Sequence, residues 1–408
     1  MLSTDPFFDE QANRTLAHTQ FGGADFGECM VTMQNMPPGD VAGWYREWTA
    51  TADRVAAIGD ACAAAGHVVS AREAYLRASN YYRTSYLMLY GAPPTPELVR
   101  AFERESVTFR EFASRATPPL EPVEIPYEGT TLPGFFCRSP YAKGRGRTLI
   151  ATNGYDSTVH EMYFGFAVAA SRRGYHSLLF DGPGQGRALI KQGLSMRPDW
   201  ENVVRPVVDY VLTRPEVDPT RLALAGWSFG GYLALRGAGG EPRLRACIAD
   251  PGFTGLWDMM KAMFARLPPE ALANPRGADP ALFAPYMAHI ESSPALRWKV
   301  VQRGFWVHGV NSLAEYLAIA RQFDNREALK SIRCPTFLAW EENDPTAGSA
   351  VEVYNALAGS KILARFLASE GAGDHCEMTA RALFHQRMFD WLDNVFTDGL
   401  RDAQLPVK

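Results

Sequence analysis

One serine in the chain stands where an activated nucleophile is expected. The stretch from Leu222 to Gly239 reads LALAGWSFGGYLALRGAG and places Ser228 in a G-x-S-x-G pattern between a strand-like run and a helix-like run. A serine on so sharp a strand-to-helix turn needs flanking glycines, because side chains at those positions would collide. The alternative is an ordinary turn between a strand and a helix. It is tested by whether an acid and a histidine follow in the order this arrangement requires.

An acid follows far downstream, in the segment CPTFLAWEENDPTAG. Asp344 lies just before Pro345, in the loop after a strand-like run, where the arrangement requires a carboxylate. Glu341 and Glu342 are the competing acids, and their alternative role is solvated loop charge. We favour Asp344 because of its distance beyond the strand.

A histidine then follows the acid on a glycine-rich loop. The segment LARFLASEGAGDHCEMTARALFHQRMFDWLD predicts a strand, a loop that holds His375, and a closing amphipathic helix. His385 lies within that helix and is expected to pack. We expect His375 to take the proton of Ser228 as a general base, and Asp344 to fix the imidazole tautomer and stabilise its cation.

Two backbone amides are the expected donors to the negative charge that develops on a substrate oxygen. One is the amide of Phe229, directly after the nucleophile. The other is the amide of Tyr155 in the segment ATNGYDST, where Gly154 permits a close approach. Asp156 in the same loop is a candidate accessory residue. The alternative for this loop is a simple β-turn.

Asp250 is a second candidate accessory residue, at the end of the apolar run ACIAD. Cleavage of a carbon–carbon bond requires an acid that protonates the leaving carbon, which is either His375 or a further carboxyl group. Asp250 is a candidate for that carboxyl group, and we expect it to face the segment that covers the site. Its alternative role is to cap a helix.

These residues must be positioned by the carboxyl ends of strands in a mainly parallel sheet. Short apolar runs alternate with helical stretches, in the order RTLIATNG, HSLLFDGPGQG, LALAGWS, ACIAD, CPTFLAWEEND and LARFLAS. This alternation predicts βαβ units, preceded by a hairpin at Glu128–Thr130. We therefore predict an α/β core over residues 119–250 and 333–408. The FDGPGQG segment lacks the full dinucleotide fingerprint and is expected to shape the loop beside the site.

Two helical segments complete the predicted organisation. Residues 1–118 form an N-terminal helical module, with the clearest helical pattern from Asp40 to Arg115. Residues 251–332 are rich in Met, Phe and Trp and are expected to form a helical lid insertion, which favours an apolar or aromatic substrate. The alternative for these side chains is the insertion's own core. Tyrosines of the helical module are expected to pack rather than to line a pocket: Tyr75, Tyr81, Tyr82, Tyr86 and Tyr90.

Composition narrows the class of partner to a small molecule. The 408 residues carry 41 basic and 45 acidic side chains, a formal net charge of −4, which argues against nucleic acid or an anionic membrane. The start MLSTDPFFDEQANR lacks a basic and apolar leader, and we expect a cytoplasmic protein with no membrane contact. Six scattered cysteines lack metal-ligand spacing, so we expect reduced thiols and neither a metal nor a cofactor.

The motifs together resemble those of the α/β-hydrolase superfamily, from about Pro122 to the C-terminus. The helical start, NGYDS, FDGPGQG, GWSFGGYLALRGA and GAGDHCE are similar to the group that contains dihydroxypseudooxynicotine hydrolase and fungal polyketide-shortening hydrolases. The resemblance implies a triad of Ser228, Asp344 and His375, a helical module that contributes to the substrate cavity, and a homodimer. It also implies cleavage of an ester or of a carbon–carbon bond beside a ketone.

Three functions are compatible with these residues. The first is hydrolysis of an apolar, polyketide- or alkaloid-like small molecule through an acyl-enzyme on Ser228. The second is the same triad used for non-hydrolytic acyl transfer or carboxylate elimination, and the third is a non-catalytic binding protein that keeps the fold. A peptidase is a minor alternative, because the peptidases that GWSFGGY resembles carry a β-rich module ahead of the catalytic domain, whereas this chain begins with helices.

Overall fold

An eight-stranded sheet organises the fold in a computed structural model, which describes residues 2–34 and 36–398. The strand order is β1-β2-β4-β3-β5-β6-β7-β8. β1 pairs antiparallel with β2, and β2 pairs antiparallel with β4, whereas the other neighbours are parallel. The predicted hairpin and mainly parallel sheet are therefore confirmed. The strands are β1 Glu121–Tyr127, β2 Thr130–Cys137, β3 Gly146–Thr152, β4 His176–Phe180, β5 Val217–Trp227, β6 Ala246–Asp250, β7 Thr336–Glu341 and β8 Lys361–Phe366.

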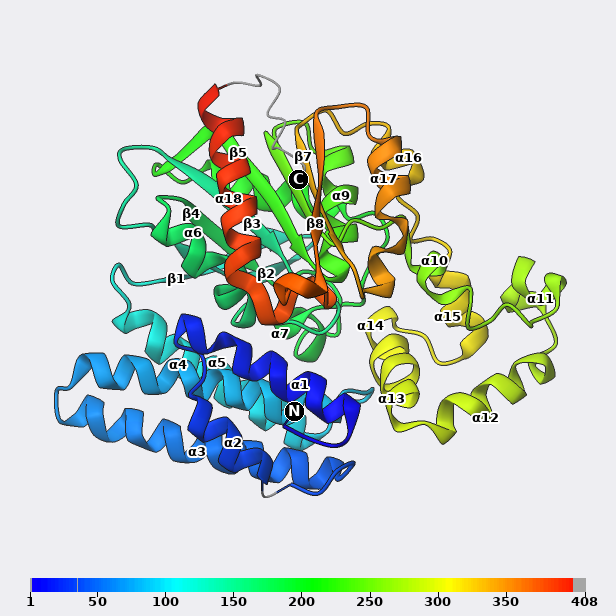
Figure 1. Cartoon of the computed structure of the whole chain (residues 1–408), viewed down its shortest axis with the longest axis horizontal. Helices are drawn as coiled ribbons and strands as arrows, with labels where there is room; N and C mark the ends of the chain where they lie inside the picture. The colour runs from blue at the N-terminus through cyan, green and yellow to red at the C-terminus, as the bar shows by residue number, and fades with distance from the viewer. Residues whose placement is uncertain (1, 35, 399–408) are drawn as a thin grey trace.

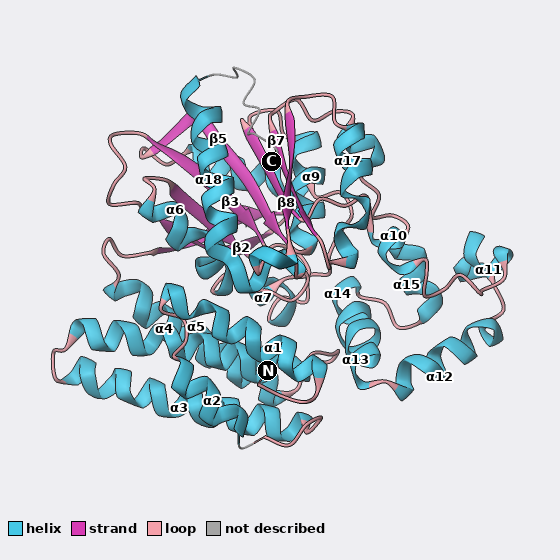
Figure 2. Ribbon diagram, viewed as in Figure 1, coloured by secondary structure: helices cyan, strands magenta, loops and turns pink. Residues whose placement is uncertain are grey.

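Helices cover both faces of this sheet, as Figure 2 shows. Side chains alternate along each central strand, so Leu149 of β3 faces one helical layer and Ile150 faces the other. Both layers are apolar, which buries the parallel strands on two sides. One layer contains α6 Val168–Arg172 and α18 Arg381–Asp398, and the other contains α8 Glu201–Leu212, α9 Phe229–Gly240 and α17 Ala350–Ala356. The short α7 Gly186–Ile190 follows β4.

Five helices precede the sheet and pack together below it in Figure 1. The first begins ahead of Asp40, where the clearest helical pattern of the sequence starts, because Asp5 caps the amides of Phe7 and Phe8 and Pro6 takes the first helical position. The five tyrosines that were expected to pack are buried, and Tyr86 donates a hydrogen bond to Glu105. These helices are α1 Pro6–Ala17, α2 Phe26–Gln34, α3 Val41–Ala64, α4 Val68–Tyr86 and α5 Pro96–Arg115.

A helical insertion separates β6 from β7, and its outer helices project from the body in Figure 1. Its inner part reaches the N-terminal module: the indole of Trp298 donates to the carbonyl of Leu87 at 2.8 Å, and Gln302 donates to the carbonyl of Tyr90 at 2.9 Å. The segment contains α10 Leu256–Met260, α11 Pro269–Ala273, α12 Ala284–Ser292, α13 Pro294–Arg297, a π-helix Trp298–Phe305, α14 Trp306–His308, α15 Leu313–Ala320 and α16 Arg326–Leu329. The division of the chain at residues 118, 250 and 332 stays a prediction.

Two further features bear on the sequence expectations. Within the described residues, no helix combines the length and the apolar character that crossing a membrane requires. The six cysteines are free thiols, four of them buried.

Candidate active site

Ser228 lies on a strained turn between β5 and α9. Its backbone has φ 60° and ψ −126°, a conformation that non-glycine residues rarely adopt. Gly226 makes the turn possible, because a Cβ atom there would lie 1.7 Å from the carbonyl oxygen of Gly230. The amide of Ser228 donates to the carbonyl of Asp250 at 2.6 Å, which ties the turn to the end of β6.

The structure brings the three residues predicted as a triad into one hydrogen-bonded line. Ser228 Oγ lies 2.8 Å from His375 Nε2, and His375 Nδ1 lies 2.6 Å from Asp344 Oδ2. Of the competing acids, Glu342 accepts a hydrogen bond from the amide of Ala368, and Glu341 is buried beside Asp250 and Glu377. The geometry therefore places Asp344, and neither of the two glutamates, beside the histidine.

Asp344 is held as a carboxylate with a fixed orientation. Its side chain is 2% exposed, and it accepts hydrogen bonds from the amide of Thr346 at 2.8 Å and from the Thr346 hydroxyl at 2.6 Å. Burial opposes its ionisation, but His375 and the Thr346 donors outweigh burial and lower the pKa of Asp344. A fixed carboxylate at this place orients the imidazole.

His375 lies on a loop with an unusual backbone. Packing disfavours its charged form, but the carboxylate of Asp344 outweighs this effect and raises the pKa of His375. The next two residues, Cys376 and Glu377, have φ values of 55° and 41°. The guanidinium of Arg381 holds this strained segment by donating to the carbonyl of Cys376 at 2.8 Å.

The loop after β3 lies directly against the serine turn. A Cβ atom on Gly154 would lie 3.1 Å from Ser228 Cβ, so the close approach expected of this glycine is present. The rings of Tyr155 and Phe229, the two residues predicted as amide donors, meet edge to face at 5.0 Å. Within the described residues, neither of these two amides donates to a protein acceptor.

Side chains of the FDGPGQG segment hold the loop after β3 in place through hydrogen bonds. Gln185 donates to the carbonyls of Asn153 at 2.7 Å and Gly154 at 3.3 Å. Asp181 accepts hydrogen bonds from Asn153 Nδ2 at 2.5 Å and from the amide of Val159 at 2.7 Å, and burial raises the pKa of Asp181 to about 6. The segment thus shapes the loop beside the site, as expected. Sequence reasoning did not single out Gln185, although its place in the segment was the available signal.

The expectation for Asp250 is wrong in both of its forms. Its side chain is fully buried and pairs with Arg381 of α18 at 2.5 Å, rather than facing the insertion. It does not cap a helix either, because Gly255 is the capping residue of α10. The physical reason is that a carboxylate at the end of β6, beneath the serine turn, requires a buried cation, which α18 supplies.

Asp250 belongs to a buried cluster of acids behind the triad. Carboxylate oxygens of Asp250, Glu341 and Glu377 lie within 4.8 Å of one another, and Arg381 supplies the positive charge. Burial and the neighbouring carboxylates raise the pKa values of Glu341 and Glu377 well above the usual value. Neither oxygen of Glu341 has a donor among the described residues, which fits a carboxyl group that carries its own proton.

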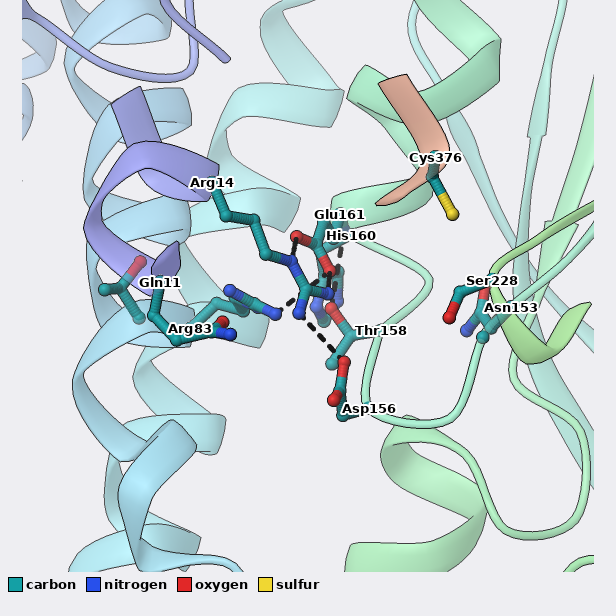
Figure 3. Close-up of polar contacts among 12 residues, drawn as sticks. Gln11, Arg14, Arg83, Asn153, Asp156, Thr158, His160, Glu161, Ser228 and Cys376 are labelled. Carbon is teal, nitrogen blue, oxygen red and sulfur yellow. Dashed lines mark hydrogen bonds and ion pairs between the residues drawn. The ribbon is translucent and has the colours of Figure 1, made fainter. Parts of the chain in front are cut away.

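Asp156 points away from Ser228 in Figure 3, toward a group of arginines and acids. It pairs with Arg14 of α1 at 2.9 Å and with Arg303 of the insertion at 2.7 Å. Sequence reasoning missed both arginines. The Asp5–Pro6 helix start was a signal for α1, but nothing local in the sequence indicates that Arg14 reaches this loop.

Aromatic side chains of the insertion pack against the rings of Phe229 and Tyr155. The ring of Phe229 lies 5.6 Å from that of Phe323, and the ring of Tyr155 lies 5.4 Å from that of His308. Burial and the charge of Arg303 lower the pKa of His308 to about 3, so its ring is neutral at physiological pH. Within the described residues, neither ring nitrogen of His308 has a hydrogen-bond partner.

A mainly parallel sheet with a serine turn at the carboxyl end of β5 is the arrangement of an α/β hydrolase. The model of the alpha/beta hydrolase family matches residues 144–385. The chain belongs to this family of enzymes.

Relatives extend the similarity over nearly the whole chain. Hydrolase acrC of Aspergillus aculeatus is 36% identical over 416 residues, with 96% of each chain covered. The 20-hydroxy-prefusarin hydrolase FUS2 of Gibberella moniliformis is 32% identical over 409 residues, with 96% of each chain covered. The crystal structure of 2,6-dihydroxy-pseudo-oxynicotine hydrolase matches with a TM-score of 0.74 at 23% identity, over 95% of this chain and 98% of that one. This last similarity shows that the two proteins share a fold.

Proposed function

We propose that this enzyme is a serine hydrolase that forms an acyl-enzyme on Ser228. The observation that carries the proposal is the continuous line from Ser228 Oγ to His375 Nε2 at 2.8 Å and from His375 Nδ1 to Asp344 Oδ2 at 2.6 Å. His375 takes the proton of Ser228 as the serine attacks a carbonyl carbon. The amides of Phe229 and Tyr155 stabilise the resulting oxyanion. His375 then returns the proton to the leaving group, and water attacks the acyl-enzyme with His375 again as base.

The proposed substrate is an apolar or aromatic small molecule with a carbonyl group, polyketide- or alkaloid-like in character. The aromatic rings around Tyr155 and Phe229 support the apolar part, because small-molecule sites combine such walls with few polar groups. The neutral ring of His308, which has no protein partner among the described residues, is suited to a substrate hydroxyl or carbonyl group. The name of the relative FUS2, a 20-hydroxy-prefusarin hydrolase, is consistent with such a substrate. The bond that breaks is an ester bond or a carbon–carbon bond beside a ketone.

A fluorophosphonate probe and the variant Ser228→Ala test the nucleophile. The probe should label the wild-type chain once, on Ser228, and the variant should show no labelling. Ser114→Ala is the matched control: it removes the hydroxyl of an exposed serine on α5, and labelling should persist. An unlabelled wild-type chain would refute the proposal and favour a non-catalytic binding protein.

Product analysis in ¹⁸O-labelled water separates hydrolysis from other uses of the triad. Hydrolysis of an acyl-enzyme must place one solvent oxygen in the acid product. If the product forms without ¹⁸O, the reaction is acyl transfer or carboxylate elimination and not hydrolysis.

A further inference from the structure

Asp156 connects three parts of the molecule at one carboxylate. It follows Tyr155 in the loop after β3, and its side chain is 12% exposed. Oδ1 accepts from Arg14 Nη1 of the N-terminal module at 2.9 Å, and Oδ2 accepts from Arg303 Nη1 of the insertion at 2.7 Å. Figure 3 shows the pair with Arg14 and the loop that leads from Asp156 back toward the serine.

The backbone and neighbours of Asp156 make the same connections. The hydroxyl of Tyr90, beyond the end of α4, donates to the carbonyl of Asp156 at 3.1 Å. The guanidinium of Arg303 lies over the ring of Tyr155 at 4.8 Å. The hydroxyl of Tyr155 lies 3.3 Å from that of Tyr316 in the insertion. The insertion thus holds the side chain of Tyr155, the residue that supplies the proposed oxyanion amide, and the N-terminal module holds the backbone of the next residue, Asp156.

The arginines keep Asp156 charged in a nearly water-free place. Burial opposes ionisation, but the charges of Arg14, Arg303 and Arg83 outweigh it and hold the pKa of Asp156 well below its usual range. The two pairs are not equivalent. Arg14 also makes a bidentate pair with Glu161, at 2.7 and 2.6 Å, whereas the ion pair of Arg303 within the described residues is with Asp156.

We propose that Asp156 is a positioning residue for the oxyanion side of the site: it fixes the loop that carries the Tyr155 amide only when Arg14 and Arg303 are both in place. The inference rests on the proposed function. It makes the N-terminal module and the insertion parts of the catalytic machinery, since each supplies one of the two cations. The chemistry at Ser228 therefore depends on whether the insertion is docked.

The test uses the full chain with Asp156→Asn, Arg303→Gln and the double variant. The readout is the rate of phosphonylation of Ser228 by a fluorophosphonate, a reaction that also develops charge on an oxygen. Each single variant should lower the rate by about 10- to 100-fold, as expected for a small displacement of a catalytic group. The double variant should be no slower than the slower single variant, because both changes remove one interaction. Asp156→Glu should recover part of the rate.

Glu121→Gln is the matched control. Glu121 accepts two hydrogen bonds from Arg214 at 2.7 Å each. It is the first residue of β1, whereas the candidate site lies at the carboxyl ends of the parallel strands. Its phosphonylation rate should stay within about twofold of wild type, since surface pairs contribute little. Additive losses in the double variant, or an unchanged rate in Asp156→Asn, would overturn the inference.

Amide hydrogen exchange tests the positioning without any reaction. Exchange in residues 153–159 and in residues 298–305 should become faster together in Asp156→Asn and stay unchanged in Glu121→Gln. Equal exchange in wild type and Asp156→Asn would refute the positioning role. Failure of the wild-type chain to react with the fluorophosphonate would instead refute the proposed function, so the two failures are distinguishable.

Discussion

The imidazole of His375 has one nitrogen toward Ser228 and the other toward Asp344, so its protonation controls the proposed reaction. Asp344 raises the pKa of His375 against the effect of packing. A histidine that acts as a base must be neutral, and reactivity should therefore rise with pH as His375 loses its proton. The charge of Asp344 sets the pH of this rise, because it raises the pKa of His375.

Asp344→Asn should move this rise to lower pH and lower its plateau. Loss of the carboxylate lowers the pKa of His375, and loss of the correct tautomer lowers the rate by about 10⁴-fold, as in other serine triads. The measurement is the rate of Ser228 phosphonylation as a function of pH. Asp374→Asn, which changes an exposed acid next to His375, should leave the profile in place. An unmoved profile in Asp344→Asn would contradict the assigned acid.

The ends of β6 and β7 and the segment before α18 meet at the buried acids Asp250, Glu341 and Glu377. Arg381 of α18 binds two of these acids and also donates to the carbonyl of Gly165 at 3.1 Å. One guanidinium cannot neutralise three carboxylates, so burial and mutual repulsion raise the pKa values of Glu341 and Glu377. Glu341 lies three residues before Asp344 in the sequence, and Glu377 lies two residues after His375, so this cluster connects fold stability to the site.

Glu341→Gln should change how stability depends on pH. Folded Glu341 keeps its proton, whereas in the unfolded chain it ionises near its usual pKa of 4.5, so wild-type stability falls as pH rises above that value. The variant lacks this loss. Its stability relative to wild type should rise by about 1.4 kcal/mol per pH unit from pH 4.5 up to the folded pKa.

Urea unfolding at pH 5, 7 and 9 measures this difference. Glu342→Gln is the control, because Glu342 is exposed and adjacent in the sequence. A pH-independent difference between wild type and Glu341→Gln would show that Glu341 is ionised in the folded protein.

The N-terminal module packs against the α/β core beside the site. Glu105 of α5 is fully buried and accepts from Thr158 at 2.6 Å and from His160 at 2.8 Å, both in the loop that leads away from Asp156. Phe109 of the same helix packs edge to face on Phe135 of β2 at 4.9 Å. The module is therefore part of the folded core. The homodimer and the cytoplasmic location stay predictions.

A chain that begins at Pro119 should fail to form a stable fold. It leaves Glu161 without Arg14 and exposes the aromatic surface that α5 covers. Near-ultraviolet circular dichroism and thermal unfolding should show loss of fixed tertiary packing and of a cooperative transition. Val68→Ser, on an exposed face of the module, is the control and should unfold as wild type does. A truncated chain with the melting temperature of the full chain would contradict this role.

The sequence predicts much of this architecture, because its signals are local. The six apolar runs after the hairpin coincide with β3 to β8, and the glycines around Ser228 predict a turn whose strained backbone the structure contains. Helix α1 was outside the clearest helical pattern, since short amphipathic segments of mixed composition give weak periodicity. Asp250 was misplaced for a different reason: the direction of its side chain depends on a cation 131 residues away.

The α/β sheet, the serine turn and the order of serine, acid and histidine are therefore readable in the amino-acid sequence, because sterics and strand periodicity act over a few residues. Long-range packing is needed to establish which acid meets His375, which carboxyl groups have raised pKa values, and that Arg14 and Arg303 meet at Asp156. Those two arginines lie 142 and 147 residues from Asp156 along the chain. Contacts of that kind depend on how whole elements pack, which no local pattern encodes.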